Sequence, residues 1–136
     1  MQHRNLFIAE ENSEAEVIIC DHTLSNHLFL TNSVTEAYVA ENASLDIVRM
    51  QNEHNQSVKI TNTWIEQMRN SIANNRNITL HGGKVRNNLN IKLKEEGANC
   101  DAKGLSLIDK NQHVDNFTVI EHEAPHCTSN QHYKSV

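Results

Sequence analysis

Hydrophobic and polar residues alternate over short stretches along most of the chain, with the period of two that is typical of β-strands. In one stretch Leu89, Ile91 and Leu93 alternate with Asn90 and Lys92, so the three apolar side chains are expected on one face. Similar segments, rich in β-branched or aromatic residues, predict strands at residues 15–20, 27–30, 34–40, 45–50, 58–67, 77–81, 89–93, 104–108 and 117–122. Polar turn clusters separate them, and the pattern therefore predicts an all-β protein.

One stretch also has a helical interpretation. In WIEQMRNSIANN, residues 64–75, the apolar residues Trp64, Ile65, Met68 and Ile72 would share one face of a helix. The flanking segments favour strand, so a short helix here is the alternative to two strands and a turn.

Asparagine is frequent, whereas the chain has only four glycines and one proline. Because Asn tolerates left-handed backbone and hydrogen-bonds its own turn, it is expected to build many tight turns. A weak repeat accompanies it: ENSEAEV at 11–17 resembles ENASLDI at 41–47, and GANCDAKGL at 97–105 enters its strand similarly. The repeat favours a β-solenoid, but an antiparallel sandwich produces similar strings, and the pattern leaves both open.

Composition narrows the classes of function. The chain has 136 residues and a net charge of −5 with scattered Lys and Arg, which predicts one domain and no nucleic-acid or anionic-membrane partner. No apolar run approaches the roughly 18 residues of a membrane span, and the N-terminal residues lack a signal-peptide layout. Cys20, Cys100 and Cys127 form no C-x-x-C pair, which favours a reducing compartment. We therefore expect a cytoplasmic protein, with Cys20 and Cys100 as small buried residues.

The segment His122-Glu123-Ala124-Pro125-His126 matches H-E-x-x-H, the zinc-protease signature. That signature works because a helix places residues i and i+4 on one face, so that both imidazoles reach one metal. Here it follows an alternating, strand-like run. Pro125 would also disrupt a helix, at about 3 kcal/mol, and favours extended backbone at Ala124. The segment is predicted to be a strand end and a turn, without protease chemistry.

Two looser sites remain open from the residues alone. A metal site could use His122, His126, Cys127 and His132, because imidazole and thiolate are suitable zinc or iron ligands. The simpler interpretation is that these residues are solvated or structural. A groove that processes carbohydrates would need clustered acidic residues. The candidate acids are Asp21, Asp101, Asp109 and Asp115, and their spacing does not suggest a cluster.

The second half of the chain resembles the SufB/SufD family of iron–sulfur cluster assembly proteins. The matching pieces lie within residues 81–136 and include Gly82-Gly83, Arg86, Gly97-Ala98, Gly104-Leu105, Gln112-His113, Asp115, Glu121-His122, Ser129 and Lys134. The repeated turn-then-strand strings upstream also fit the coils of the family. Within it, Pro125–Asn130 and Arg86–Asn90 resemble the SufD branch more than SufB.

The resemblance implies a right-handed parallel β-helix, with residues 1–136 as one β-helix core domain. It further implies that the chain is a SufD-like component of the SufB–SufC–SufD scaffold complex and that its partners are SufB-like and SufC-like proteins. Such a component is not an enzyme by itself, since ATP hydrolysis belongs to SufC, and it meets an iron–sulfur cluster only transiently. No catalytic, cofactor-binding or metal-binding residue of the family can be placed on this sequence. The alternative is a His/Cys-rich metal-binding β-protein.

The family also implies segments beyond those present here. Full-length members have a preceding helical region, further coils with a Cys-Ser-His-Gly-type motif, and a C-terminal helical region that binds SufC. We therefore expect a chain truncated at both ends relative to those members. A solenoid cut between coils exposes strand edges and an apolar face, so the fragment is expected to self-associate.

Overall fold

The computed structural model describes residues 1–24 and 26–136, and it contains ten β-strands. Their bounds are β1 Gln2–Ala9, β2 Glu14–His22, β3 Leu30–Val39, β4 Ser44–Asn52, β5 Val58–Gln67, β6 Ile72–His81, β7 Lys84–Leu93, β8 Asn99–Ser106, β9 His113–His122 and β10 Thr128–Ser135. The described residues form no helix, and they accordingly offer none that could cross a membrane.

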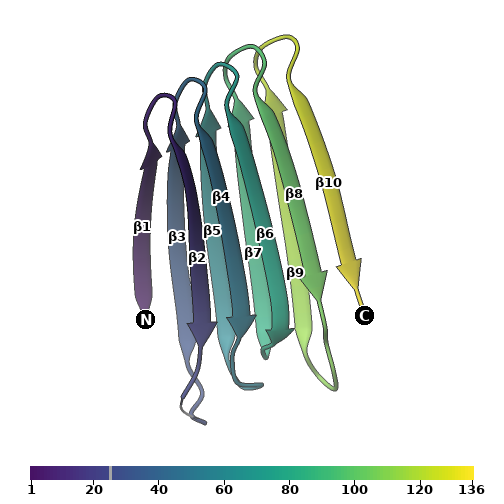
Figure 1. The fold of residues 1–136 in the computed structure, drawn as a ribbon. Helices are drawn as coiled ribbons and strands as arrows, with labels where there is room; N and C mark the ends of the chain where they lie inside the picture. Colours follow the sequence, from purple (N-terminus) through teal and green to yellow (C-terminus); the bar gives the residue numbers. More distant parts are fainter. Residues whose placement is uncertain (25) are drawn as a thin grey trace.

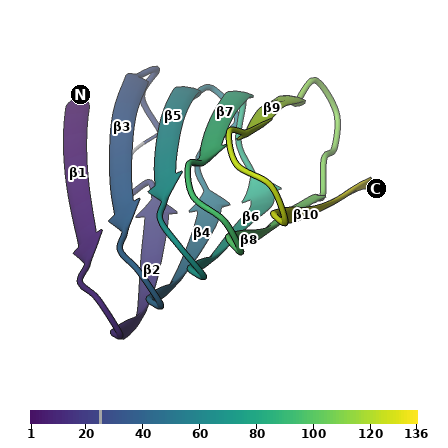
Figure 2. The ribbon, with the colours of Figure 1, turned by 90° about the horizontal axis from the view of Figure 1, so that it is seen from above.

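The strands form two parallel sheets that the chain visits in turn. The odd-numbered strands make one sheet, in the order β1-β3-β5-β7-β9, and the even-numbered strands make the other, in the order β10-β8-β6-β4-β2. In Figure 1 the more distant odd strands run upwards, the nearer even strands run downwards, and the path advances from the N-terminus to the C-terminus as a right-handed coil. Figure 2 shows the two sheets as two layers joined by short turns. The fold is the right-handed parallel β-helix that the resemblance implied.

Equivalent positions in successive coils lie directly beside one another. Ser33 pairs with His3, 30 residues earlier, and Asn87 pairs with Thr61, 26 residues earlier. The coil length therefore varies, and the strands stay in register because the connections absorb the difference. All the strand pairs are parallel, which decides against the antiparallel sandwich.

Most of the predicted strands are confirmed, but three details differ. The predicted strand at 27–30 contributes only Leu30 to β3, and the prediction missed the strands β1 and β10. The helical alternative at 64–75 is wrong, since β5 continues to Gln67 and β6 begins at Ile72. Five of the eight residues of β10 are Thr, Ser, Asn or Gln, so pairing with β8 rather than local hydrophobicity makes it a strand.

Three of the five short turns use asparagine, as the sequence predicts. One residue in each turn has left-handed backbone, and these residues occupy equivalent positions; they are Asn12, Asn42, Asn70, Gly97 and His126. The backbone N–H groups of Asn12, Asn42 and Asn70 each donate to a carbonyl of the next coil, at 3.0, 2.9 and 3.1 Å. At Gly97 an added Cβ would lie 2.1 Å from Oδ1 of Asn70. The fourth turn thus requires glycine where the first three use asparagine.

The interior divides into two halves. Next to the short turns lies an apolar half of small and aliphatic side chains; its members include Val39, Leu45, Ile47, Ile65, Leu89, Ile91, Leu93, Ala98, Cys100 and Ala102. Next to the longer connections lies a polar half with buried hydroxyl, amide and charged side chains; its members include Thr31, Ser33, Thr35, Arg49, Gln51, Glu53, Lys59, Thr61, Thr79 and Asn87. Residues Leu89, Ile91 and Leu93 face inwards as predicted.

Strand β5 shows how the polar half arises. Lys59, Thr61 and Thr63 point into the interior and are buried, whereas Trp64 on the outer face is 42% exposed. The inward positions are therefore polar over the first half of this strand. Cysteine positions also differ from expectation: Cys100 is buried as predicted, but Cys20 is exposed, because it precedes the inward-facing Asp21 on β2.

Candidate functional site

A cluster of four charged side chains lies inside the first coils, and its centre is Lys59. The Lys59 side chain is 1% exposed, and its Nζ donates to Oε1 of Glu53 at 2.9 Å and contacts Oδ2 of Asp21 at 2.9 Å. Arg49, on the strand β4 that pairs with β2, donates to the same Asp21 oxygen at 3.4 Å. We call Asp21, Arg49, Glu53 and Lys59 the buried ion cluster. Its two cations balance its two anions, which is what burial of charge requires.

Arg49 connects the buried ion cluster to the hydroxyl groups of the opposite sheet. Its Nη1 donates to Oγ of Ser33 at 3.2 Å, and its Nη2 donates to Oγ1 of Thr35 at 3.0 Å. Burial lowers the pKa of the guanidinium, and the charges of Asp21 and Glu53 oppose this effect. Because an arginine pKa starts so high, Arg49 stays charged at neutral pH, and it acts as a fixed positive anchor between the sheets.

A second set of buried polar groups continues from the buried ion cluster along the axis. Asn87 lies at its centre: its Oδ1 accepts from Oγ1 of Thr61 at 2.7 Å and from Nε2 of Gln51 at 2.9 Å. Its Nδ2 donates to Oδ1 of Asn116 at 2.9 Å. Gln51 also accepts from Oγ1 of Thr79 at 2.6 Å. Three of these bonds join neighbouring strands within a sheet, and the bond between Gln51 and Asn87 crosses from one sheet to the other, so this second set forms one hydrogen-bonded network across several coils.

A hollow of about 530 Å³ opens beside the buried ion cluster, at the N-terminal end of the helix. Its lining includes His3, Thr31, Glu53 and Lys59. Glu53 is 6% exposed, and its Oε2 has no hydrogen-bond partner among the residues that the structure describes. The hollow therefore places a buried carboxylate oxygen and a buried ammonium group beside apolar side chains such as Leu24 and Phe29.

The His/Cys residues near the C-terminus do not converge on one point. His122 Nε2 lies 2.9 Å from Oγ of Ser129, whereas His126 lies in an exposed turn, 3.8 Å from Oε1 of Glu96. Cys127 donates to the carbonyl of Glu95, and His132 lies on β10 beside Lys103 of β8. Across residues 1–24 and 26–136, no three His, Cys, Asp or Glu side chains are grouped to hold one metal ion. The geometry therefore does not support the metal-site hypothesis.

The H-E-x-x-H segment has the structure that its proline predicted. Strand β9 ends at His122, residues 123–127 form the fifth short turn, and β10 begins at Thr128. The four aspartates are also separate: Asp21 is in the buried ion cluster, Asp109 is in a connection, and Asp101 and Asp115 lie on different sheets. No acidic groove forms from them.

Comparison with known sequences identifies the family. Residues 1–136 match the family described as SUF system FeS cluster assembly, SufBD core domain. The chain belongs to the SufBD family. One relative, an iron–sulfur cluster assembly SufBD family protein of Synechocystis sp. (strain ATCC 27184 / PCC 6803 / Kazusa), is 25% identical over 144 residues. The alignment covers 100% of this chain and 32% of the relative, so the SufBD-family chain spans about a third of the relative's length.

Sequence reasoning missed the buried ion cluster of this SufBD-family chain. Lys59 and Glu53 belong to residue types that are almost never fully buried without a partner, and nothing in their local sequence pairs them. One signal was available: Lys59, Thr61 and Thr63 alternate with Val58, Ile60 and Trp64. In this strand the pattern favours the apolar residues Val58, Ile60 and Trp64 as the inward set, whereas the structure buries the polar set, because Lys59 finds its ionic partners in other segments.

Proposed function

We propose that this protein is a SufD-like component of a SufB–SufC–SufD complex that assembles iron–sulfur clusters. The single observation that carries the proposal is the match to the SufBD core over all residues, 1–136. The choice of the SufD branch rests on the strings Pro125–Asn130 and Arg86–Asn90, which resemble that branch. The protein acts in the cytoplasm, as its sparse, unpaired cysteines favour.

The proposed role is that of a scaffold and not of an enzyme. The buried ion cluster supports this role, since its charged side chains are paired with one another and stabilise the coil. ATP hydrolysis would come from the SufC-like partner, and the cluster would be cargo of the complex, held only transiently.

The test is a binding assay with purified SufB-like and SufC-like proteins from the same organism. A SufD-like chain is expected to retain the SufB-like protein on a column and to show no ATP hydrolysis alone. A parallel assay uses a purified SufD-like protein, and retention of that protein in preference to the SufB-like one would assign the chain to the SufB branch. Failure to bind either protein would contradict the proposed role.

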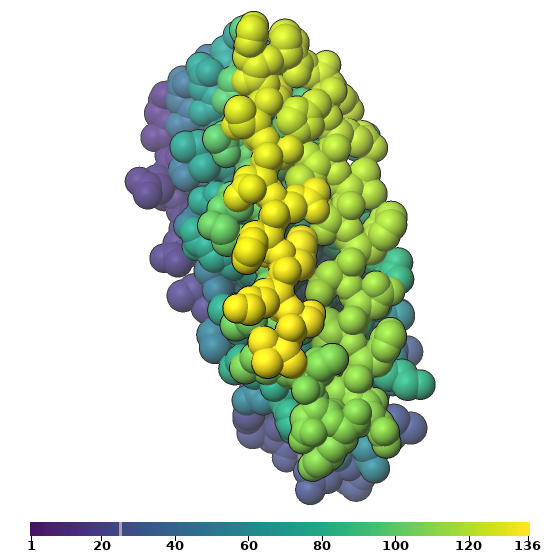
Figure 3. All heavy atoms as spheres, turned by 90° about the vertical axis from the view of Figure 1, so that its right-hand side faces the viewer, coloured from purple at the N-terminus to yellow at the C-terminus, as the bar shows by residue number. Residues whose placement is uncertain are grey.

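Self-association is the second part of the proposal. Strands β1 and β9 border one sheet and β2 and β10 border the other, and the last coil spans the C-terminal end in Figure 3. Border strands present unpaired backbone groups that template pairing with a second chain. Light scattering across micromolar concentrations is expected to show a mass that rises with concentration. A constant monomer mass would contradict this part and leave the binding assay unaffected.

A further inference from the structure

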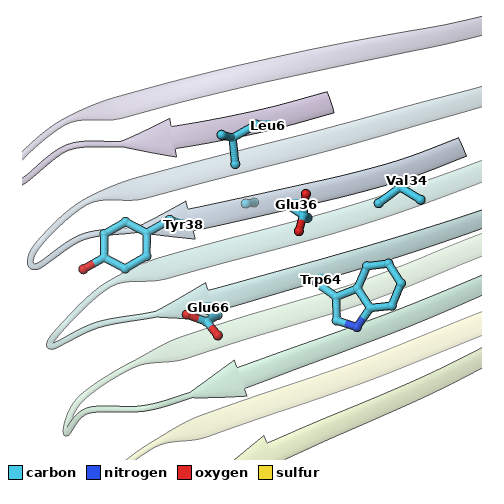
Figure 4. Close-up of a pocket in the computed structure, with 7 residues that line it drawn as sticks. Leu6, Val34, Glu36, Tyr38, Trp64 and Glu66 are labelled. Atoms are coloured by element: carbon cyan, nitrogen blue, oxygen red, sulfur yellow. The ribbon is translucent and has the colours of Figure 1, made fainter. Parts of the chain in front are cut away.

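The outer face of the odd-numbered sheet carries an exposed apolar groove with aromatic walls. The groove has a volume of about 620 Å³, and Leu6, Val34, Tyr38 and Trp64 line it together with two glutamates (Figure 4). Trp64 is the only tryptophan in the chain, and Leu6 is 63% exposed. Exposed Trp and Tyr are typical anchors of protein interfaces, so this groove is a candidate binding surface.

Strand register arranges four of these side chains as a square. Glu36 pairs with Trp64, and Tyr38 pairs with Glu66, across β3 and β5. Residues two apart on a strand share a face, and neighbouring strands lie about 4.8 Å apart. The two aromatic rings therefore occupy one diagonal and the two carboxylates the other. We call Glu36, Tyr38, Trp64 and Glu66 the aromatic–acidic quartet.

The chemistry of the aromatic–acidic quartet favours arginine. A guanidinium is planar, stacks on the face of an aromatic ring and donates two parallel hydrogen bonds to a carboxylate. The same chain already places a guanidinium on this carboxylate, since Nε and Nη2 of Arg4 both lie against the one oxygen Oε2 of Glu36, at 2.8 and 2.7 Å. Both side chains are exposed, and exposed pairs contribute only about 0 to 1 kcal/mol, so another guanidinium can replace Arg4.

The surroundings of the quartet define the rest of the ligand. Leu6 and Ile8 on β1 are 63% and 62% exposed and lie beside Glu36 and Tyr38 in register, which favours aliphatic neighbours of the bound cation. Glu10 and Glu41 follow the ends of β1 and β3 and extend the negative charge towards the short turns. Glu66 is paired with Lys94 at 3.4 Å on the exposed surface, so a bound arginine would exchange with this cation as it would with Arg4. The aliphatic neighbours of that arginine would cover Leu6 and Ile8.

We propose that the aromatic–acidic quartet is a docking site for another protein, which inserts an arginine flanked by aliphatic side chains. This inference goes beyond the proposed scaffold role and does not depend on the SufD assignment. The guanidinium lies between Glu36 and Glu66 against Trp64, and the flanking side chains pack on Leu6 and Ile8.

Trp64 reports on this site directly because it is the only tryptophan. The probe is the peptide acetyl-Leu-Arg-Leu-Arg-Leu-amide, and the matched control peptide carries citrulline, the neutral isostere of arginine, at both arginine positions. Titration of the full chain with the arginine peptide is expected to shift Trp64 emission saturably. Binding of the citrulline peptide is expected to be about tenfold weaker, the scale of losing a charged partner. Equal responses to the two peptides would overturn the proposal.

Variants distinguish binding at the quartet from non-specific binding elsewhere on the surface. The double variant Glu36→Gln and Glu66→Gln is expected to bind the arginine peptide about tenfold more weakly than the wild type. Glu121→Gln is the matched control, because Glu121 lies on the same outer row, two strands from Glu66. The affinity of this variant for the arginine peptide is expected to equal that of the wild type. Circular dichroism checks that each variant is folded.

Two results with the variants would contradict the proposal. Wild-type affinity in the double variant, or an equal loss in Glu121→Gln, would exclude the quartet as the binding site. A mass doubling in light scattering that the double variant abolishes would assign the groove to a second copy of this chain instead of an arginine-bearing partner.

Discussion

The two halves of the interior are built by the same strands and stabilised by different physics. In the apolar half, side chains such as Ile65, Ile91 and Leu93 exclude water, and their contribution grows with the area that they bury. In the polar half, Lys59 and Asn87 are equally buried, but they contribute only while their partners are in place. The comparison teaches that equal burial does not mean equal tolerance to change.

The two halves also differ in how far an interaction extends. An aliphatic side chain packs against its immediate neighbours, and its loss leaves a local cavity. Asn87, in contrast, bonds to residues from three other strands, Gln51, Thr61 and Asn116. The polar half therefore couples the coils more specifically, and a change in it is expected to propagate further.

The largest expected effect is in the polar half. Lys59→Ala leaves Glu53 and Asp21 buried without the ammonium group that both contact at 2.9 Å. Loss of one member of a buried ion pair destabilises by about 3 to 5 kcal/mol. Urea unfolding followed by circular dichroism measures this loss. As a control, Lys92→Ala removes an exposed pair with Glu121 and is expected to change stability by less than about 1 kcal/mol.

A compensated variant keeps this test informative if Lys59→Ala fails to fold. The triple change Asp21→Asn, Glu53→Gln and Lys59→Met removes the charges together, and it is expected to recover most of the stability, since apolar or neutral replacement of a whole buried pair is often tolerated. A triple variant as unstable as Lys59→Ala would show that shape, and not charge balance, governs the polar half.

The next effect is in the apolar half. Ile91→Ala empties volume between Ile65 and Ile120 of the neighbouring coils and is expected to destabilise by about 3 kcal/mol. Ile72→Ala is the matched control, because Ile72 is 44% exposed on the outer face. Urea unfolding of both compares them directly. If the two variants lost equal stability, the apolar half would not be the core of the molecule.

The smallest effect concerns pH and Cys100 in the apolar half. Burial, followed by the charge of Asp101, raises the pKa of the Cys100 thiol from its ordinary value of 9.0 to about 11. The unfolded chain therefore ionises first, and stability is constant below pH 9 but falls between pH 9 and 11. The expected loss is about 2 to 3 kcal/mol, at about 1.4 kcal/mol per unit.

Unfolding at a series of pH values in a reducing buffer measures this loss. Cys100→Ala is expected to remove the loss between pH 9 and 10, whereas Cys20→Ala, at an exposed position, is expected to keep it. Above pH 10 Tyr133 contributes as well, because burial raises the pKa of its hydroxyl. If the Cys100→Ala protein lost stability with the same alkaline slope, another group would titrate in this pH range, and Cys100 in the apolar half would not be responsible.

Much of the fold could be predicted from the sequence, and the missing parts have physical causes. The alternation of Leu89, Ile91 and Leu93 gave both the strand and its inward face, and asparagine in the turns is explained by its left-handed backbone. Strand β10 was missed because its residues are mostly polar and it forms by pairing with β8. Trp64 suggested a helix because Trp64, Ile65 and Met68 also fit a helical period.

The sequence by itself determined the short strands, the turns between them and a family resemblance that the comparison confirms. Only the tertiary structure decided which face of β5 is buried, because Lys59 finds its ionic partners in other segments, and these keep the polar face of the strand inside. Asp21 comes from β2 in the opposite sheet and Glu53 from the residue after β4, and these two carboxylates make burial of Lys59 favourable. The same strand register places Trp64 beside Glu36 on the outer face, a contact between residues that local sequence cannot bring together.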